Sequence, residues 1–211
     1  MGKNSAYLFL FFTLFLFACE EKKYDLPYYG RHEVVDGDTV YYRVPKFQFI
    51  NQDSARITHR NVEGKVYVAD FFFTYCPTIC PAKTRQLTRI QDSLKRYNLF
   101  GKEVILISHT VDPDRDTPSV LKTYAEVHSI DTTGWYLVTG EKDYLYRIAK
   151  EGYLSTAFAD EKAEGGFFHT DQFILLDGER HLRGFYDGTD PGEVDRLWKD
   201  IKALTIDDVT K

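Results

Sequence analysis

The chain has 211 residues and a formal net charge of −5, and 43% of its residues are hydrophobic and 16% aromatic. This composition is sufficient for one domain with a core of its own and excludes global disorder. The negative charge argues against non-specific nucleic-acid binding, and the sequence contains no phosphate-binding motif of the GxxxxGK[ST] or GxGxxG type.

The first eighteen residues differ from the rest of the chain. After a single charge at Lys3, the run of residues 7–18 is uncharged and largely apolar. It is shorter than the about 20 apolar residues of a membrane-spanning helix and has the length of the apolar part of an export signal. Because Ala18 precedes Cys19, as in a bacterial lipoprotein signal, we predict a signal peptide over residues 1–18 and a lipid on Cys19. An uncleaved N-terminal anchor is the alternative.

Export would place the remaining chain in the periplasm of a bacterial cell envelope, attached to a membrane by its lipid. Residues 19–30 are predicted to form a polar tether, and residues 31–207 the folded domain. Once Cys19 is acylated, Cys76 and Cys80 are the two cysteines left as thiols. An oxidising compartment favours a disulfide between such thiols unless they are protected.

The folded part alternates between strand and helix patterns. Asp36-Gly37, between two runs rich in valine and tyrosine, predicts a β-hairpin over residues 34–42. The remaining predicted elements are strands over residues 47–50, 55–58, 65–74, 104–107, 135–138, 173–176 and 182–185, and helices over 81–97, 117–127, 142–150 and from 191 onwards. This order predicts an α/β fold with a mixed sheet flanked by helices and an additional N-terminal β-hairpin. A strand that leads through a cysteine motif into a helix is the thioredoxin-like arrangement.

The cysteine pair lies where the strand predicted over residues 65–74 gives way to a helix. Three residues separate Cys76 from Cys80, and residues four apart on a helix share a face, so both sulfur atoms can point at one place. The N-terminal end of a helix favours a thiolate, the form that binds metals and attacks disulfides. Thiolates select copper(I) or zinc, whereas a disulfide within a regular helix needs distortion. A structural disulfide is the simpler alternative.

A site with two thiolates normally takes another ligand, and the chain has six histidines. His169 follows a pair of glycines and precedes the strand predicted over residues 173–176. In a thioredoxin-like sheet this strand returns beside the strand that leads to the cysteines. A flexible glycine-rich loop could therefore bring His169 to the two sulfur atoms, although a surface or core histidine is the simpler interpretation of these residues alone.

Three segments together resemble the Sco/SenC family of copper proteins. Residues 74–81, with the sequence TYCPTICP, resemble the TxCPxxCP signature of the family. Residues 111–118, with the sequence VDPDRDTP, resemble its VDPxRDTP segment, and His169-Thr170 ahead of a strand resembles its third element. The match extends from residue 45 to about residue 204.

The resemblance implies a metallochaperone rather than an enzyme, with a thioredoxin-like fold that binds one copper ion through Cys76, Cys80 and His169. It implies a role in assembly of the copper A centre of cytochrome c oxidase, so the expected partner is the copper A subunit or another copper acceptor. Two thiolates and a neutral imidazole would give a copper(I) site with a net charge of −1, whereas copper(II) would recruit a further oxygen ligand.

A thiol–disulfide oxidoreductase that reduces the partner's cysteines before they take up metal is the alternative function. Such proteins usually carry a cis-proline just before the late core strand, and this chain has no proline between Pro118 and Pro191. This absence favours a metal site without excluding redox exchange through the same pair. A thiol peroxidase is a weaker alternative, because its chemistry needs neither the spacing of the two cysteines nor His169.

Three further features of the matched segments carry predictions. His109 is expected to be a core or surface residue rather than an auxiliary ligand. The acids of residues 112–116 are expected to precede a helix, with Arg115 paired locally, because hard carboxylates suit magnesium or calcium better than a thiolate site. Docking of a partner is the functional alternative for them. Tyr75 stands where many family members have histidine, and we expect it to alter polarity near the site.

Overall fold

The computed structural model of the chain describes residues 25–159 and 167–206. For residues 157–159 and 167–169 it describes the backbone and not the side chains. The predicted signal peptide, Cys19 and the first part of the predicted tether lie outside the described residues. In the two described ranges, no helix combines the length and the apolar character needed to cross a bilayer.

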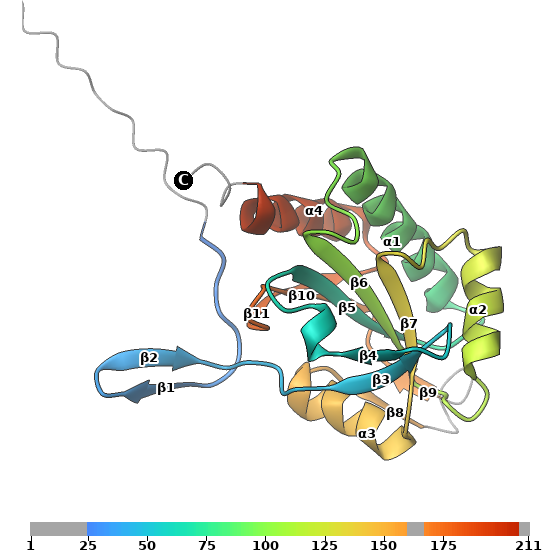
Figure 1. The fold of residues 1–211 in the computed structure, drawn as a ribbon, viewed down its shortest axis with the longest axis horizontal. Coiled ribbons are helices and arrows are strands. Elements are labelled where there is room, and N and C mark those ends of the chain that lie inside the picture. Colours follow the sequence, from blue (N-terminus) through green and yellow to red (C-terminus); the bar gives the residue numbers. More distant parts are fainter. Residues whose placement is uncertain (1–24, 160–166, 207–211) are drawn as a thin grey trace, which may run out of the picture.

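A mixed sheet with the strand order β11-β10-β5-β6-β7-β3-β4 forms the centre of the fold (Figure 1). Its strands are β3 (Gln48–Asn51), β4 (Arg56–Thr58), β5 (Val66–Phe72), β6 (Val104–Thr110), β7 (Trp135–Thr139), β10 (Gln172–Leu176) and β11 (Leu182–Asp187). Strands β5, β6 and β7 are parallel, whereas β10 pairs with β5 in the antiparallel direction. Every residue of β5 and β6 is buried, as expected for central strands that are covered on both faces.

The helical segments of the described residues cover both faces of this sheet. They are η1 (His59–Asn61), α1 (Ile79–Arg96), α2 (Pro118–Val127), α3 (Lys142–Arg147), η2 (Ile148–Gly152) and α4 (Pro191–Thr205). The buried residues of α1 recur every three or four positions: Cys80, Lys83, Thr84, Leu87, Ile90, Gln91 and Leu94. One face of α1 therefore packs on the sheet, with α4 and α2 beside it (Figure 1).

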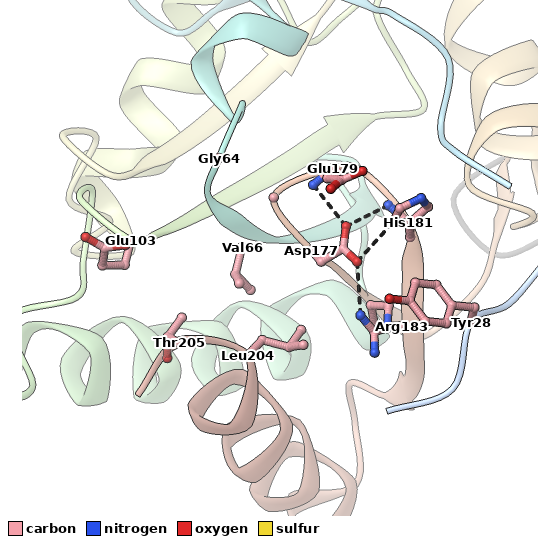
Figure 2. A pocket seen from close by; sticks show the side chains of 11 residues that line it. Tyr28, Gly64, Val66, Glu103, Asp177, Glu179, His181, Arg183, Leu204 and Thr205 are labelled. Atoms are coloured by element: carbon pink, nitrogen blue, oxygen red, sulfur yellow. Dashed lines mark hydrogen bonds and ion pairs between the residues drawn. The ribbon is translucent and has the colours of Figure 1, made fainter. Parts of the chain in front are cut away.

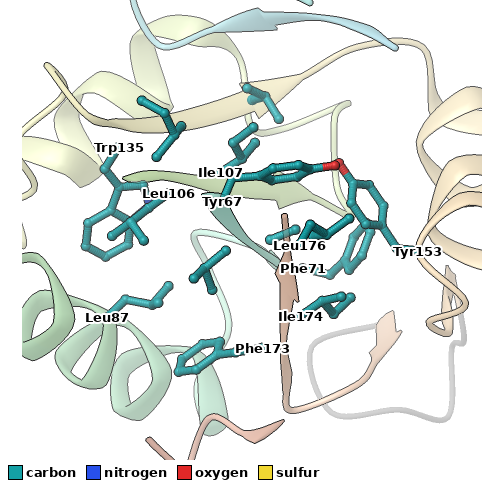
Figure 3. Close-up of a cluster of buried hydrophobic side chains, with 14 of the residues drawn as sticks. Tyr67, Phe71, Leu87, Leu106, Ile107, Trp135, Tyr153, Phe173, Ile174 and Leu176 are labelled. Carbon is teal, nitrogen blue, oxygen red and sulfur yellow. The ribbon is translucent and has the colours of Figure 1, made fainter. Parts of the chain in front are cut away.

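Successive residues of a strand point to opposite faces of the sheet, and β5 shows this clearly. Asp70 faces α1, whereas Phe71 faces the other way and packs against Tyr153, which follows η2. Figure 3 shows Leu87 of α1 on one side of the central strands and the rings of Phe71 and Tyr153 on the other. Both layers are needed to bury the sheet, so the α/β sandwich is the stable arrangement.

The N-terminal hairpin consists of β1 (His32–Val35) and β2 (Asp38–Tyr41), with Val35 opposite Asp38. Asp36 and Gly37 both have positive φ, 53° and 89°, which a two-residue type I′ turn requires. The hairpin residues are exposed, and the hairpin projects away from the rest of the fold (Figure 1). The segment before it packs on the domain, because the Tyr29 amide donates to the Leu182 carbonyl of β11 at 2.9 Å.

The predicted α/β fold, with its mixed sheet, flanking helices and extra hairpin, is confirmed. Besides the unpredicted η1 and the division of the helix predicted over residues 142–150 into α3 and η2, one further segment differs from the prediction. The structure has two short strands, β8 (Ala157–Ala159) and β9 (Phe167–His169), where the sequence predicts only a flexible loop before residue 170. Ala157 pairs with His169, so His169 ends a strand. Neither of these two segments shows the periodic pattern of a strand in the sequence.

Candidate metal centre

The cysteines are placed by the junction between β5 and α1. Cys76 lies in the loop that follows β5, where its amide donates to the Phe73 carbonyl at 3.3 Å, and Cys80 lies in the first turn of α1. The prediction that both share one face of a regular helix is therefore wrong in detail, because α1 begins at Ile79. The two residues still converge: the Cys80 amide donates to Cys76 Sγ at 3.5 Å. A helix N-terminus thus points at the first sulfur.

Both cysteine side chains are buried, with 7% of Cys76 and 1% of Cys80 exposed. The hydrogen bond with Cys76 and burial raise the pKa of the Cys80 thiol, and the charge of Lys83 only partly opposes this rise. The protonated thiol of Cys80 is therefore favoured in the metal-free protein. Metal binding at this pair must release protons, and it is expected to strengthen as the pH rises.

Asp116 joins the cysteine loop to the VDPxRDTP segment. It is fully buried, and its carboxylate accepts hydrogen bonds from the Thr74 amide at 3.2 Å, the Thr74 hydroxyl at 2.5 Å and the Thr110 hydroxyl at 2.5 Å. Burial raises the pKa of Asp116, whereas the two threonine hydroxyls lower it. A residue of the VDPxRDTP segment thus holds the start of the cysteine loop by hydrogen bonds, although the two motifs are far apart in the sequence.

The other charged residues of this segment have protein partners. Arg115 pairs with Asp112, and Asp114 pairs with Lys142 at 2.8 Å. The prediction that Arg115 pairs locally is confirmed. Arg115 also lies over the ring of Tyr75, 5.6 Å from its centroid, and 64% of Tyr75 is exposed. The residue before the first cysteine therefore contacts the arginine of the second motif at the surface.

His169 is brought to the same end of the sheet by its backbone. Strand β10 runs beside β5, with Ile174 opposite Ala69, so the segment before β10 reaches the end of β5 that leads to the cysteines. The predicted return of this segment beside the cysteine strand is confirmed for the backbone. Within the side chains that the structure describes, no three His, Cys, Asp or Glu residues cluster as a metal site. Ligation by His169 stays a prediction.

His109 belongs to the core on the opposite face of the sheet. It is fully buried, its Nδ1 lies 3.1 Å from the Asp70 carbonyl oxygen, and its ring packs against Phe49, Phe71 and Tyr153. Of the two places predicted for this histidine, core or surface, the structure shows the core. Burial lowers the pKa of His109 to about 4, so the imidazole is neutral in the folded protein near pH 7.

His109→Phe is expected to make the fold less sensitive to acid. The unfolded His109 takes up a proton near pH 6.5 and the folded one near pH 4, so its contribution to stability is complete above about pH 6.5 and is lost as the pH falls toward about 4. The wild type should therefore lose about 3 kcal/mol more than His109→Phe between about pH 7 and pH 4. Urea unfolding at several pH values measures this difference, and equal losses in the two proteins would contradict it.

A polar pocket lies at the other end of the sheet, near the start of β5 (Figure 2). Asp177 lies at its centre and accepts hydrogen bonds from Arg183 at 3.0 Å and from His181 Nδ1 at 3.1 Å. Arg183 also donates to the carbonyl oxygen of Leu26 at 2.6 Å. These groups satisfy one another and fasten the segment before the hairpin to β11, so we interpret the pocket as structural.

The donor set at the cysteine end suits a soft ion. Two buried sulfur atoms converge at a helix N-terminus, and the carboxylates nearby are engaged in hydrogen bonds or ion pairs. Thiolates favour copper(I) or zinc over hard cations. The residues present therefore fit the copper ion that the resemblance implies.

The fold and the cysteine pair together define a thioredoxin-like dithiol protein. The family model SCO1/SenC matches residues 38–205. The chain belongs to the SCO1/SenC family.

Three solved structures show what this chain is similar to. A SCO1/SenC family lipoprotein from Bacillus anthracis is 32% identical with a TM-score of 0.70, over 77% of this chain and 95% of that one. BsSco, described as a Sco family member with a disulfide switch and as a cytochrome c oxidase assembly protein, is 28% identical with a TM-score of 0.69, over 78% and 94%. Copper-bound ScoI from Arabidopsis thaliana is 25% identical with a TM-score of 0.63, over 76% and 99%.

Two polar residues of this region are missing from the sequence predictions. Asp70 interrupts the apolar run of β5, and Lys83 lies on the buried face of α1, three residues after Cys80. They form a buried ion pair with 3.4 Å between Lys83 Nζ and Asp70 Oδ2. The sequence contains a signal for this ion pair: one charged residue inside a buried strand and one on the apolar face of a helix. A charged side chain is rarely buried without an oppositely charged or hydrogen-bonding partner.

Proposed function

We propose that this chain is a copper metallochaperone that binds one copper ion through Cys76, Cys80 and His169. It passes the ion to the copper A subunit of cytochrome c oxidase or to another copper acceptor. The observation that carries the proposal is the contact between two buried thiols at the N-terminus of α1, where the amide and the thiol of Cys80 both interact with Cys76. The relatives of this family member include a copper-bound protein and an oxidase assembly protein.

The residues of this chain prepare the site for a soft monovalent ion. Binding of copper(I) replaces the thiol protons of Cys76 and Cys80, and burial keeps hard ligands and water away from the two sulfur atoms. A neutral His169 imidazole would complete a three-coordinate site with a net charge of −1. Release to an acceptor then proceeds by exchange of one ligand at a time, since the acceptor's own thiolates can replace these ligands.

Attachment to a membrane is part of the proposal. The apolar run before Cys19 supports a lipid anchor, and the similar Bacillus anthracis protein is described as a lipoprotein. A lipid on Cys19 would hold the domain at a membrane surface of the bacterial envelope, where a membrane-bound oxidase subunit can be reached. Mass measurement of the N-terminal peptide from cells tests this point.

Thiol–disulfide exchange is the second candidate function. The two thiols are close enough to interact, and the similar protein BsSco is described as having a disulfide switch. In this reaction the Cys76 and Cys80 thiols would become a disulfide, and two electrons and two protons would reduce a disulfide of the partner. Such a reduction would prepare the partner's cysteines for metal.

Anaerobic copper(I) titration of the reduced full chain in detergent, against a competing chelator, decides between the two functions. We expect one tightly bound copper ion per chain. Weak copper binding together with rapid reduction of a disulfide in a peptide from the copper A subunit would instead support the oxidoreductase. Incubation of the copper-loaded chain with the reduced peptide then tests transfer.

A further inference from the structure

A lysine lies buried within one helical turn of the cysteine pair. Only 1% of the Lys83 side chain and 4% of the Asp70 side chain are exposed, and their ion pair is cut off from water. Burying two charges carries a desolvation cost that a well-packed apolar pair would avoid. The cost is offset here by hydrogen bonds, and the partners of these bonds suggest what the pair does.

Lys83 Nζ has three polar neighbours. They are Asp70 Oδ2 at 3.4 Å, the Phe71 carbonyl oxygen at 2.9 Å and the Thr170 carbonyl oxygen at 3.3 Å. An ammonium group has three donors, and here it makes two hydrogen bonds to carbonyl oxygens and an ion pair with a carboxylate. The three acceptors belong to β5 and to the segment between β9 and β10. Lys83 therefore joins the helix of the cysteines, the strand that leads to them and the residue directly after His169.

The contact with Thr170 lies where the sheet itself stops. Pairing between β10 and β5 runs from Leu176 opposite Tyr67 to Ile174 opposite Ala69, and it does not extend to Phe71. Beyond that point Lys83 connects the two backbones, because its ammonium group donates to the carbonyl oxygens of Phe71 and Thr170. A buried side chain thus takes the place of ladder hydrogen bonds at the end of the sheet nearest the cysteines.

Asp70 fixes the position of the ammonium group. Its Oδ1 accepts from the Ser108 hydroxyl at 2.5 Å, and the Ser108 oxygen accepts from Trp135 Nε1 at 2.9 Å. These bonds run across β5, β6 and β7, the rigid parallel part of the sheet. Thr170 is also bonded to the segment before β8, through the Ser155 hydroxyl at 2.8 Å and the Thr156 carbonyl at 3.2 Å. Lys83 therefore connects a rigid scaffold to a short two-stranded element.

We infer that Lys83, held by Asp70, is a positioning residue that fixes the backbone beside His169 against β5 and so sets the distance between His169 and the cysteine pair. This inference rests on the proposed function, because it takes His169 as the third copper ligand. The ion pair of Lys83 and Asp70 is neutral as a whole. Its effect on copper therefore comes from placement of the histidine segment rather than from added charge.

A double-mutant cycle tests the inference. Lys83→Met combined with Asp70→Asn removes both charges, retains side-chain volume and leaves an acceptor for Ser108. In the otherwise wild-type chain this pair of changes should weaken copper(I) affinity about 10- to 100-fold, as loss of an outer-shell partner typically does. In a His169→Ala background the same changes should alter affinity less than about threefold, because the positioned ligand is gone. Equal losses in the two backgrounds would overturn the inference.

Hydrogen exchange of the metal-free chain provides a readout that does not depend on copper. Amides of residues 167–172 should exchange faster in the Lys83→Met/Asp70→Asn protein, whereas unchanged exchange there would overturn the inference. If the wild type binds no copper, the proposed function fails and the exchange result still decides whether Lys83 holds this segment. Should the double variant fail to fold, Lys83→Gln, which keeps an amide donor, takes its place in both measurements.

Lys65→Met is the matched control. Lys65 Nζ also donates to a backbone carbonyl, that of Gly101 at 2.9 Å, but it lies at the opposite end of β5. We expect this change to leave both copper affinity and exchange at residues 167–172 within about twofold of wild type. A comparable loss in Lys65→Met would show that loss of any lysine–carbonyl hydrogen bond beside β5 perturbs the site, which would also overturn the inference.

Discussion

Serine in place of Cys80 is expected to abolish tight copper(I) binding by this chain. A serine hydroxyl is a hard donor that stays protonated at neutral pH, and copper(I) selects soft thiolates. The loss in affinity should exceed the about 100-fold loss that removal of an outer-shell partner causes. Cys76→Ser should have the same effect, since the two thiols interact with each other. Anaerobic titration against a competing chelator measures both variants.

His169→Ala should weaken copper binding less than either serine variant, because two thiolates remain. His32→Ala is its control: His32 is an exposed histidine of β1, and its loss should leave the affinity unchanged. Wild-type affinity in Cys80→Ser would exclude the cysteine pair as the copper site. Equal affinities of His169→Ala and His32→Ala would exclude His169 as a ligand and would leave the two cysteines as ligands.

Asp116→Ala is expected to give the largest loss of stability among the charged residues of the VDPxRDTP segment. Removing the carboxylate takes the acceptor from the Thr74 amide and from the hydroxyls of Thr74 and Thr110. Each buried donor left unsatisfied costs about 1–3 kcal/mol of stability. The variant also no longer buries a carboxylate, and this gain offsets part of the cost of the three lost hydrogen bonds. We expect a net loss of about 3 kcal/mol in urea unfolding.

The same change should weaken copper binding, because Thr74 fixes the start of the loop that carries Cys76. Asp114→Ala is the matched control in this segment. Asp114 is 69% exposed and pairs with Lys142, and an exposed pair contributes at most about 1 kcal/mol. If Asp116→Ala were no less stable than Asp114→Ala, the hydrogen bonds of Asp116 would not be what holds the loop.

Most of the fold could be predicted from local sequence patterns. The hairpin turn at Asp36-Gly37, the buried runs of β5 and β6 and the helical spacing of α1 each follow from residues close together in the chain. The start of α1 differs from the prediction, because Pro81 suggests a first helical residue and the structure begins the helix at Ile79. The earlier start places Cys80 within the helix, whereas Cys76 lies in the loop with either start.

The sequence by itself determined the order of the elements, the place of the cysteine pair at a strand–helix junction and the motifs that identify the family. Only the tertiary structure decided what holds the site. Thr74 meets Asp116 across 42 positions of the chain, and Lys83 meets Thr170 across 87. Such pairs leave no periodic signal, because the register and order of the strands bring them together and local propensity does not. The sequence alone identifies the two thiols, whereas the contacts that hold the segments around them depend on how the sheet is assembled.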